Sequence, residues 1–192
     1  MNIRTRLCMS LDGFVTTPDG WPVQLADPSF VPGESHGFPE FQESCEAVLM
    51  GRTTFEPALG SDRWPWPNLD AFVLGSSRPS GTPDHVVTES DPVRLLEEVR
   101  AANDGRDVHL VGGPRTIETF RALGALDRLG LIVLPLLLGG GMRLTPPVSS
   151  GAELTSAASC LVTSDEQCAR DAWTAGMASS ARRSATSSRE VA

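Results

Sequence analysis

The chain has 192 residues, with 16 basic and 24 acidic side chains, a net charge of −8 and an isoelectric point of about 4.8. This length suits one domain, or one domain and a tail, and the acidic balance argues against nucleic acid or an anionic membrane as the main partner. The longest apolar stretch, residues 129–138, is interrupted by Pro135 and is far shorter than the roughly 20 residues that span a bilayer. The four cysteines form no metal-binding pattern with the histidines, so we expect reduced thiols, no metal and a cytoplasmic protein.

Strand-like and helix-like segments alternate along the first three quarters of the chain. Short apolar runs predict strands at residues 3–9, 47–50, 69–74, 85–88, 108–111 and 129–134. Residues 16–37, rich in Gly, Pro, Asp and Ser, predict a loop. Helices are expected at residues 39–46, 53–59, 92–104 and 114–123. This alternation predicts an α/β three-layer sandwich, with a mainly parallel central sheet and helices on both faces.

Three further expectations concern packing. Asp91 can cap the helix that begins at Pro92, and Val93, Leu96 and Val99 would share its apolar face, with Leu95 widening that face. Trp64 and Trp66 are expected to pack over the sheet. His109 is expected to be a strand residue with a satisfied hydrogen bond.

Three segments combine an apolar run, then Gly or Ser, then a basic residue. They are residues 48–54, 73–79 and 109–115. Each would end a strand where backbone N–H groups can face an anion, and arginine adds a planar fork suited to phosphate. Three such segments favour a dinucleotide, with NADPH preferred over NADH because of the arginines. No P-loop or Gly-x-Gly-x-x-Gly pattern occurs, which excludes the NTPase and standard Rossmann interpretations.

The predicted cofactor-binding residues line one cleft at the carboxyl ends of the strands. They are Gly51, Arg52, Thr53, Thr54, Ser76, Ser77, Arg78, Gly112, Gly113, Pro114 and Arg115.

Residues 10–14, 49–54, 76–79, 111–114 and 134–144 carry a family resemblance. Their sequences and order resemble the dihydrofolate reductase superfamily, and are similar to the C-terminal reductase domain of the bifunctional riboflavin-biosynthesis deaminase–reductase. The resemblance covers residue 1 to about residue 147. It implies a dihydrofolate reductase-like fold and an NADPH-dependent reductase acting on a pterin- or aminopyrimidine-like substrate.

The resemblance also implies residue roles. Arg52 and Arg78 would lie near the adenosine 2′-phosphate, the Gly51 turn would hold the pyrophosphate, and Gly112–Gly113 would lie against the cofactor, often through a cis peptide. The Asp12 loop would border the nicotinamide. The substrate residues would be Ser10, Gly13 and Glu40, and Asp12 is the candidate catalytic residue.

Several alternatives stay open. Val111 stands where the riboflavin reductases carry Glu, so the riboflavin-pathway substrate, 5-amino-6-ribosylaminouracil phosphate, is one option among several. The proton could come from Asp12, a loop glutamate or water. The alternative function is a non-catalytic or degenerate remnant that binds nucleotide, or binds nothing. A homodimer is the default for this family.

The last part of the chain differs in composition. From residue 149 onward Ser and Ala dominate, and no strand-like alternation is sustained. We therefore predict a reductase domain at residues 1–148 and a disordered tail at 149–192, with the family's C-terminal strands missing. A shifted reading frame near Pro147 would explain this combination.

Overall fold

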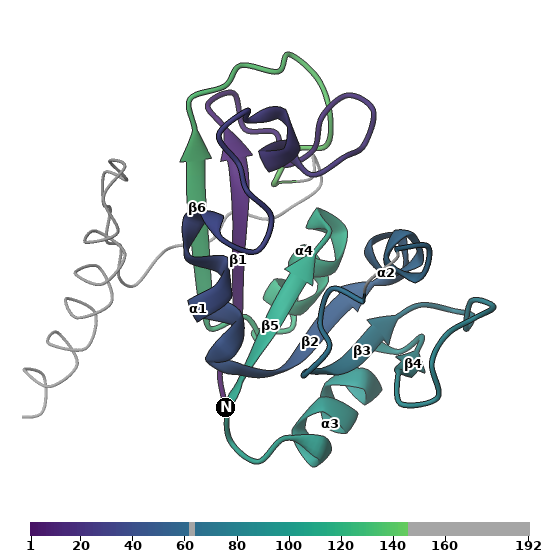
Figure 1. The fold of residues 1–192 in the computed structure, drawn as a ribbon. Helices are drawn as coiled ribbons and strands as arrows, with labels where there is room; N and C mark the ends of the chain where they lie inside the picture. Colours follow the sequence, from purple (N-terminus) through teal and green to yellow (C-terminus); the bar gives the residue numbers. More distant parts are fainter. Residues whose placement is uncertain (62–63, 146–192) are drawn as a thin grey trace, which may run out of the picture. The chain divides into compact units, whose positions relative to one another are not determined.

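The computed structural model describes residues 1–61 and 64–145, and within them one six-stranded sheet (Figure 1). The strands are β1 (Ile3–Ser10), β2 (Cys45–Gly51), β3 (Asp70–Leu74), β4 (Val87–Glu89), β5 (Asp107–Gly112) and β6 (Arg128–Leu134). Their order across the sheet is β4-β3-β2-β5-β1-β6, and every neighbouring pair is parallel. The predicted parallel α/β sheet is therefore confirmed. The predicted tail and missing C-terminal strands lie outside the described residues.

A loop without a helix joins β3 to β4, and the other connections between consecutive strands contain helices, as is usual for parallel pairing. The helices are α1 (Phe38–Glu43), α2 (Arg52–Leu59), α3 (Pro92–Ala102) and α4 (Pro114–Ala122), with short 3₁₀ helices η1 (Val23–Ala26) and η2 (Ser35–Gly37) between β1 and α1. The helix predicted at residues 39–46 ends earlier, at Glu43. Cys45 and Glu46 instead begin β2, where the Cys45 side chain is buried.

The side chains of β2 alternate between two cores. Ala47 and Leu49 pack with α3 and α4, where Phe120 is fully buried. Val48 and Met50 pack with Phe55 of α2. Because successive strand residues point to opposite faces, α3 and α4 cover one face of the sheet and α2 covers the other.

Helix α1 lies on the α2 face. Val108 and Leu110 belong to the core under α3 and α4, so His109 between them points to the opposite face. There the Phe41 ring of α1 packs edge-on against the His109 ring, with 4.7 Å between ring centroids.

Helix α3 begins as predicted but buries a narrower stripe. The Asp91 side chain accepts a hydrogen bond from the Val93 N–H at 2.8 Å. Leu95, Leu96 and Val99 are buried, whereas Val93 is exposed, so its place in the predicted stripe is wrong. At about 100° per residue, Val93 lies roughly 110° away from the centre of the other three.

The tryptophans pack as predicted. The Trp66 side chain is buried in the core under α2. The Trp64 ring packs edge-on against Phe55 and Trp66, with centroid distances of 5.9 and 5.4 Å.

None of the helices in the described part of the chain has the length and apolar character that crossing a membrane requires.

Candidate functional site

The carboxyl ends of three neighbouring strands bring the predicted cofactor segments together. Strands β3, β2 and β5 are adjacent and parallel, so their carboxyl ends share one edge of the sheet. Met50 of β2 is in register with Gly112 of β5, and Gly51 with Leu74 of β3. Helix α2 follows β2, the Ser76 segment follows β3, and α4 follows β5. The three segments that sequence analysis selected therefore lie at one edge.

Two glycines at this edge allow the close packing around Arg52 and α4. A Cβ atom at Gly51 would collide with the Thr116 hydroxyl of α4. A Cβ at Gly75 would lie 3.2 Å from the Arg52 Cβ. The absence of side chains at these positions lets both helices approach the strand ends.

The turn between β5 and α4 is open to a ligand. Its Gly112–Gly113 peptide is cis, as the resemblance implies, and Gly112 has a φ of 134°, a region that favours glycine. A Cβ at Gly112 would meet nothing within 4 Å, and one at Gly113 would meet only the Thr54 hydroxyl, at 3.9 Å. Pro114 begins α4 and is buried, whereas the Arg115 and Thr53 side chains are exposed.

Arg52 projects from the start of α2 toward the end of β3. Its Nη1 donates to Ser77 Oγ at 2.8 Å, and its Nε lies 3.1 Å from Glu56 Oε1. The side chain is 43% exposed. Arg52 is thus held beside the Ser76–Ser77 segment without being buried.

Arg78 is held differently. Its Nη1 donates to the Val86 carbonyl at 2.8 Å, and its Nη2 donates to the Pro83 carbonyl at 2.7 Å. These bonds close the loop between β3 and β4. The Arg78 guanidinium therefore braces its own loop, and fewer of its N–H groups remain for a ligand.

A hollow of about 230 Å³ lies between the ends of β3 and β4. It is lined by Gly75, Ser76, Ser77, Arg78, Thr88, Glu89 and Ser90. The Thr88 hydroxyl is buried and has no hydrogen-bond partner among the described residues. Glu89 Oε1 accepts hydrogen bonds from the N–H groups of Asp91 at 2.9 Å and Ser90 at 2.6 Å, and these bonds lower the pKa of Glu89. Sequence analysis missed Thr88, Glu89 and Ser90, because only the pairing of β4 with β3 brings them here.

The Asp12 carboxylate joins two loops. One oxygen accepts from Ser10 Oγ at 2.6 Å, and the other accepts from the backbone N–H groups of Gly139 at 2.7 Å and Leu138 at 3.1 Å. The Ser10 and Gly139 bonds, with that from Leu138, lower the pKa of Asp12 to about 2. At neutral pH the carboxylate is ionised, so it is a hydrogen-bond acceptor and not a proton donor.

Further contacts tie the same loops together. The Ser10 hydroxyl accepts from the Phe14 N–H at 3.0 Å, and the Gly13 carbonyl accepts from the Leu144 N–H at 3.2 Å. The Arg143 guanidinium donates to the Asp12 carbonyl at 3.1 Å and lies over the Phe14 ring. Ser10, Asp12 and Gly13 thus lie together at the end of β1, as expected for one site.

Glu40 lies apart from these three residues, on α1. Its side chain is exposed and makes no ion pair or hydrogen bond with the described residues. Its charge acts on Arg6 of β1, whose pKa it raises against the larger, opposite effect of burial. The structure therefore associates Glu40 with Arg6 and not with Asp12.

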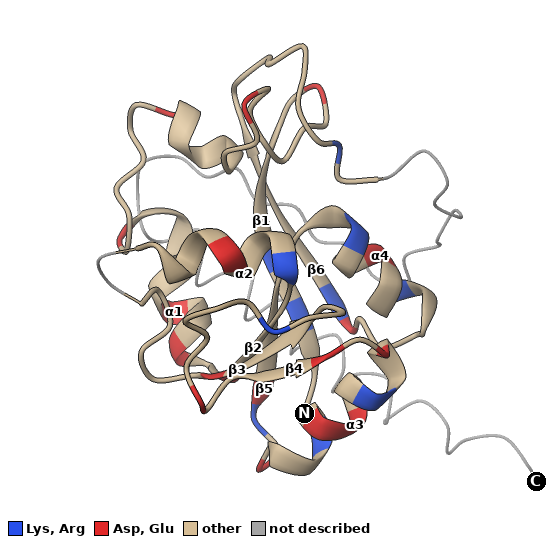
Figure 2. Ribbon diagram, turned by 90° about the vertical axis from the view of Figure 1, so that its right-hand side faces the viewer, with Lys and Arg blue, Asp and Glu red and all other residues tan. Residues whose placement is uncertain are grey.

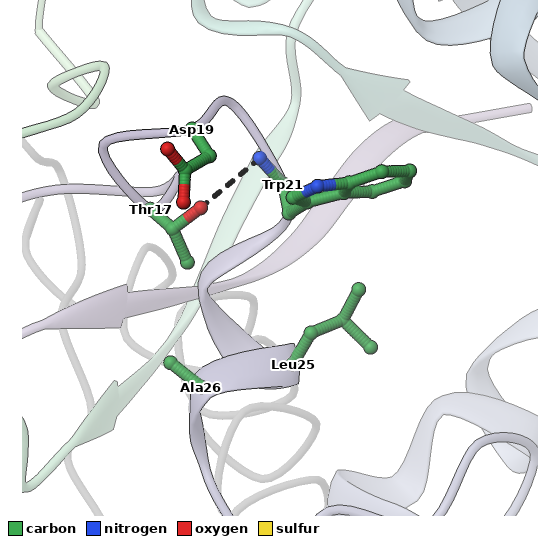
Figure 3. Close-up of a pocket in the computed structure, with 5 residues that line it drawn as sticks. All are labelled: Thr17, Asp19, Trp21, Leu25 and Ala26. Atoms are coloured by element: carbon green, nitrogen blue, oxygen red, sulfur yellow. Dashed lines mark hydrogen bonds between the residues drawn. The ribbon is translucent and has the colours of Figure 1, made fainter.

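A second hollow, of about 450 Å³, opens on the loop between β1 and α1 (Figure 3). It is lined by Thr17, Asp19, Trp21, Leu25 and Ala26. The Trp21 side chain is 60% exposed, and the backbone N–H of Trp21 donates to Thr17 Oγ1 at 3.2 Å. Sequence analysis assigned these residues to a loop and gave them no role. The sequence signal that could have pointed to this hollow was a tryptophan within a Gly- and Pro-rich segment.

Charges of both signs are interspersed over the helices. Acidic and basic positions both occur on each of the helices α2, α3 and α4 (Figure 2). Within residues 1–61 and 64–145, no group of three or more His, Cys, Asp or Glu side chains is arranged to hold a metal ion.

Comparison with known proteins agrees with this architecture. The model of the RibD C-terminal domain family matches residues 2–167. The chain belongs to the RibD C-terminal domain family. The match includes the first part of the segment that sequence analysis assigned to the tail. The resemblance to the riboflavin-biosynthesis reductase domain is therefore confirmed at the level of the family.

Individual relatives are distant. The uncharacterized protein YwjB of Bacillus subtilis (strain 168) is 24% identical over 139 residues, which cover 72% of this chain and 79% of YwjB. The uncharacterized protein YyaP of the same organism is 27% identical over 154 residues, covering 72% and 77%. The crystal structure of a "Putative riboflavin biosynthesis protein" from Shewanella sp. PV-4 matches with a TM-score of 0.64 at 26% identity, covering 84% of this chain and 89% of that chain. Together these findings support a riboflavin-pathway, reductase-like function.

Proposed function

We propose that this protein is an NADPH-dependent reductase that transfers hydride to a small pterin- or aminopyrimidine-like heterocycle. One observation carries the proposal. The ends of β2, β3 and β5 bring Gly51–Arg52, the Ser76–Arg78 segment and Gly112–Gly113 to one edge of the sheet. Ligands of open parallel sheets bind at this edge.

The residues present fit a dinucleotide. The open Gly112–Gly113 turn and the N-terminal N–H groups of α2 and α4 suit a pyrophosphate. The hollow at Ser76–Arg78 suits the adenosine ribose, and its unpartnered Thr88 hydroxyl can bond to that group. When bound, NADPH supplies the hydride.

Within this site we assign the two arginines different roles. Arg52, held toward Ser77 yet partly exposed, binds the 2′-phosphate. Arg78 holds the loop that carries Ser76 and Ser77. Glu89 lines the same hollow and its negative charge opposes a phosphate, so the preference for NADPH over NADH depends on Arg52.

Asp12 and Ser10 position the loop at the end of β1 beside the expected nicotinamide and substrate. Because the Asp12 carboxylate is ionised, a loop glutamate or water remains as the proton source.

The proposal is tested by titrating the protein with NADPH and NADH while recording tryptophan fluorescence. NADPH oxidation is then followed by absorbance with a panel of pterins and aminopyrimidines, including the riboflavin-pathway substrate. Saturable NADPH binding with turnover is the expected result. Binding without turnover across the panel would favour the nucleotide-binding remnant, and absence of NADPH binding would refute the proposed reductase. An Arg100→Ala variant, in the exposed last turn of α3, is the matched control.

A further inference from the structure

Glu89 lines the hollow between the ends of β3 and β4, and its position there is fixed by the sheet. Thr88 and Glu89 of β4 are in register with Val73 and Leu74 of β3. Beyond this pairing the Gly75 N–H donates to the Glu89 carbonyl at 2.9 Å. The hollow of about 230 Å³ therefore has an acidic residue on a paired strand, and not on a free loop, in its wall.

The two carboxylate oxygens of Glu89 differ in their partners. Oε1 accepts hydrogen bonds from the backbone N–H groups of Ser90 at 2.6 Å and Asp91 at 2.9 Å, and from the Ser90 hydroxyl at 3.2 Å. Oε2 makes no hydrogen bond or ion pair with the described residues. The bonds from Asp91 and Ser90, with a smaller contribution from the charge of Arg94, lower the pKa of Glu89, so the carboxylate is ionised at neutral pH. One oxygen holds the side chain in place, and the other is left to accept hydrogen bonds from a ligand.

The charges around the hollow favour a group with free hydroxyls. Arg78 is the basic residue among those that line it, and its guanidinium donates to carbonyls of its own loop. Arg52 lies at the rim, where it donates to Ser77 Oγ and pairs with Glu56 at 3.1 Å. An ionised carboxylate repels a phosphate but accepts strong hydrogen bonds from hydroxyl groups. The wall formed by Glu89 is thus better suited to an unphosphorylated sugar than to a phosphorylated one.

We propose that Glu89 is a specificity-determining residue whose free Oε2 accepts hydrogen bonds from the adenosine ribose hydroxyls, so that the site takes NADH as well as NADPH. This inference rests on the proposed function, because it assigns a role within the proposed cofactor site. A carboxylate that accepts from the ribose 2′-hydroxyl is a known way of binding NAD in other α/β folds. The Thr88 hydroxyl, buried and without a partner among the described residues, is available to the second ribose hydroxyl.

Arg52 and Glu89 then act in opposite directions on the same position of the cofactor. The arginine favours a 2′-phosphate, and the carboxylate favours a 2′-hydroxyl. The ratio of the two affinities is set by both residues, so removing the charge of Glu89 should make the protein more selective for NADPH.

The test compares the dissociation constants of NADPH and NADH for wild type, Glu89→Gln and Glu98→Gln, measured by tryptophan fluorescence. Glutamine keeps an oxygen for the N–H groups of Ser90 and Asp91, so the turn before α3 is retained. We expect Glu89→Gln to tighten NADPH binding by about two- to fivefold. It should weaken NADH binding by about three- to tenfold, because a hydrogen bond to a neutral amide is weaker than one to a carboxylate.

The matched control is Glu98→Gln, which removes the same charge from the exposed side of α3 and should leave both affinities unchanged. An unchanged ratio of the two affinities in Glu89→Gln would overturn the inference. So would the same change in Glu98→Gln, since it would reflect net charge and not a contact, or a wild type without measurable affinity for NADH.

Adenosine fragments separate this inference from the proposed function, because they lack the nicotinamide. Calorimetric titrations with 5′-AMP and with adenosine 2′,5′-bisphosphate should show that Glu89→Gln weakens the first and tightens the second. If both fragments bind and neither responds to Glu89→Gln, the specificity role fails while the reductase proposal stands. If the fragments respond as expected but no heterocycle is reduced, the role of Glu89 stands without the reductase. If neither fragments nor dinucleotides bind, both proposals fail.

Discussion

Replacing Arg52 by Ala should separate NADPH from NADH. Arg52 is half-exposed and held beside the hollow by Ser77, so its charge-assisted bond to a 2′-phosphate is partly screened by solvent. A hydrogen bond to a charged group contributes about 1.5–3 kcal/mol, and we take the lower end because of this exposure. A loss of about 1.5 kcal/mol corresponds to roughly tenfold weaker NADPH binding. NADH lacks that phosphate, so its affinity should change little.

The assay is a fluorescence titration of wild type, Arg52→Ala and Arg78→Ala with each cofactor. Loss of the exposed Arg52–Glu56 pair costs about 0.3–0.5 kcal/mol of stability, which is too little to unfold the protein and mimic the effect. Arg78→Ala removes the brace of the loop between β3 and β4, so both cofactors should weaken together. Equal losses of NADPH and NADH in Arg52→Ala would refute the assignment of that arginine to the 2′-phosphate.

Two further predictions concern the loops and the strand ends. Asp12→Ala leaves the backbone N–H groups of Leu138 and Gly139 without their acceptor, so their hydrogen exchange should accelerate, while the exchange of Leu110 in β5 stays slow. Unchanged exchange at Leu138 and Gly139 would show that Asp12 does not hold the loop. Gly51→Ala forces a methyl group against the Thr116 hydroxyl and should destabilise the protein by about 1–3 kcal/mol in urea unfolding. The Gly51→Ala, Thr116→Ala double variant should recover part of that lost stability. If the stability losses of the two single variants simply add in the double variant, the collision is contradicted.

The fold was accessible from sequence because local patterns and tertiary packing agree. Short apolar runs such as residues 47–50 became buried parallel strands, and the Asp91–Pro92 pair began α3 as expected. The errors occurred where periodicity does not specify a boundary or a face. Val93 is apolar yet exposed, because three neighbouring residues on α3 already fill the available core face.

The site was accessible only in part. Motif residues such as Gly51 and Gly112 could be grouped, because the carboxyl ends of parallel strands meet at one edge. The partners of a side chain could not be predicted. Arg52 and Arg78 follow similar motifs, yet one donates to Ser77 and the other to carbonyls of its own loop. That difference arises from the path of residues 78–86, which no short motif records.

His109 is a second side chain whose surroundings the sequence did not predict, and its burial affects stability. It was expected to have a satisfied hydrogen bond, but neither ring nitrogen meets hydrogen-bond geometry with a described residue. Burial lowers its pKa from 6.5 to about 3 and outweighs the opposite effect of the nearby Arg6 backbone, and the charges of Arg4 and Arg6 add smaller lowering contributions. Below pH 6.5 the unfolded chain therefore binds a proton at His109 that the folded protein does not bind. The stability contributed by neutral His109 is complete above pH 6.5 and is lost progressively as the pH falls toward 3.

His109→Met introduces an apolar side chain of similar size and removes this titration. Between pH 7 and pH 5 the wild type should lose about 2 kcal/mol more stability than the variant, since one proton is linked to unfolding at about 1.4 kcal/mol per pH unit below 6.5. Urea unfolding at the two pH values measures the difference. This range lies above the pKa of about 2 of Asp12, so the bonds from Ser10, Leu138 and Gly139 remain in place throughout. Parallel pH profiles for the two proteins would mean that His109 takes up its proton in the folded state as it does in the unfolded chain.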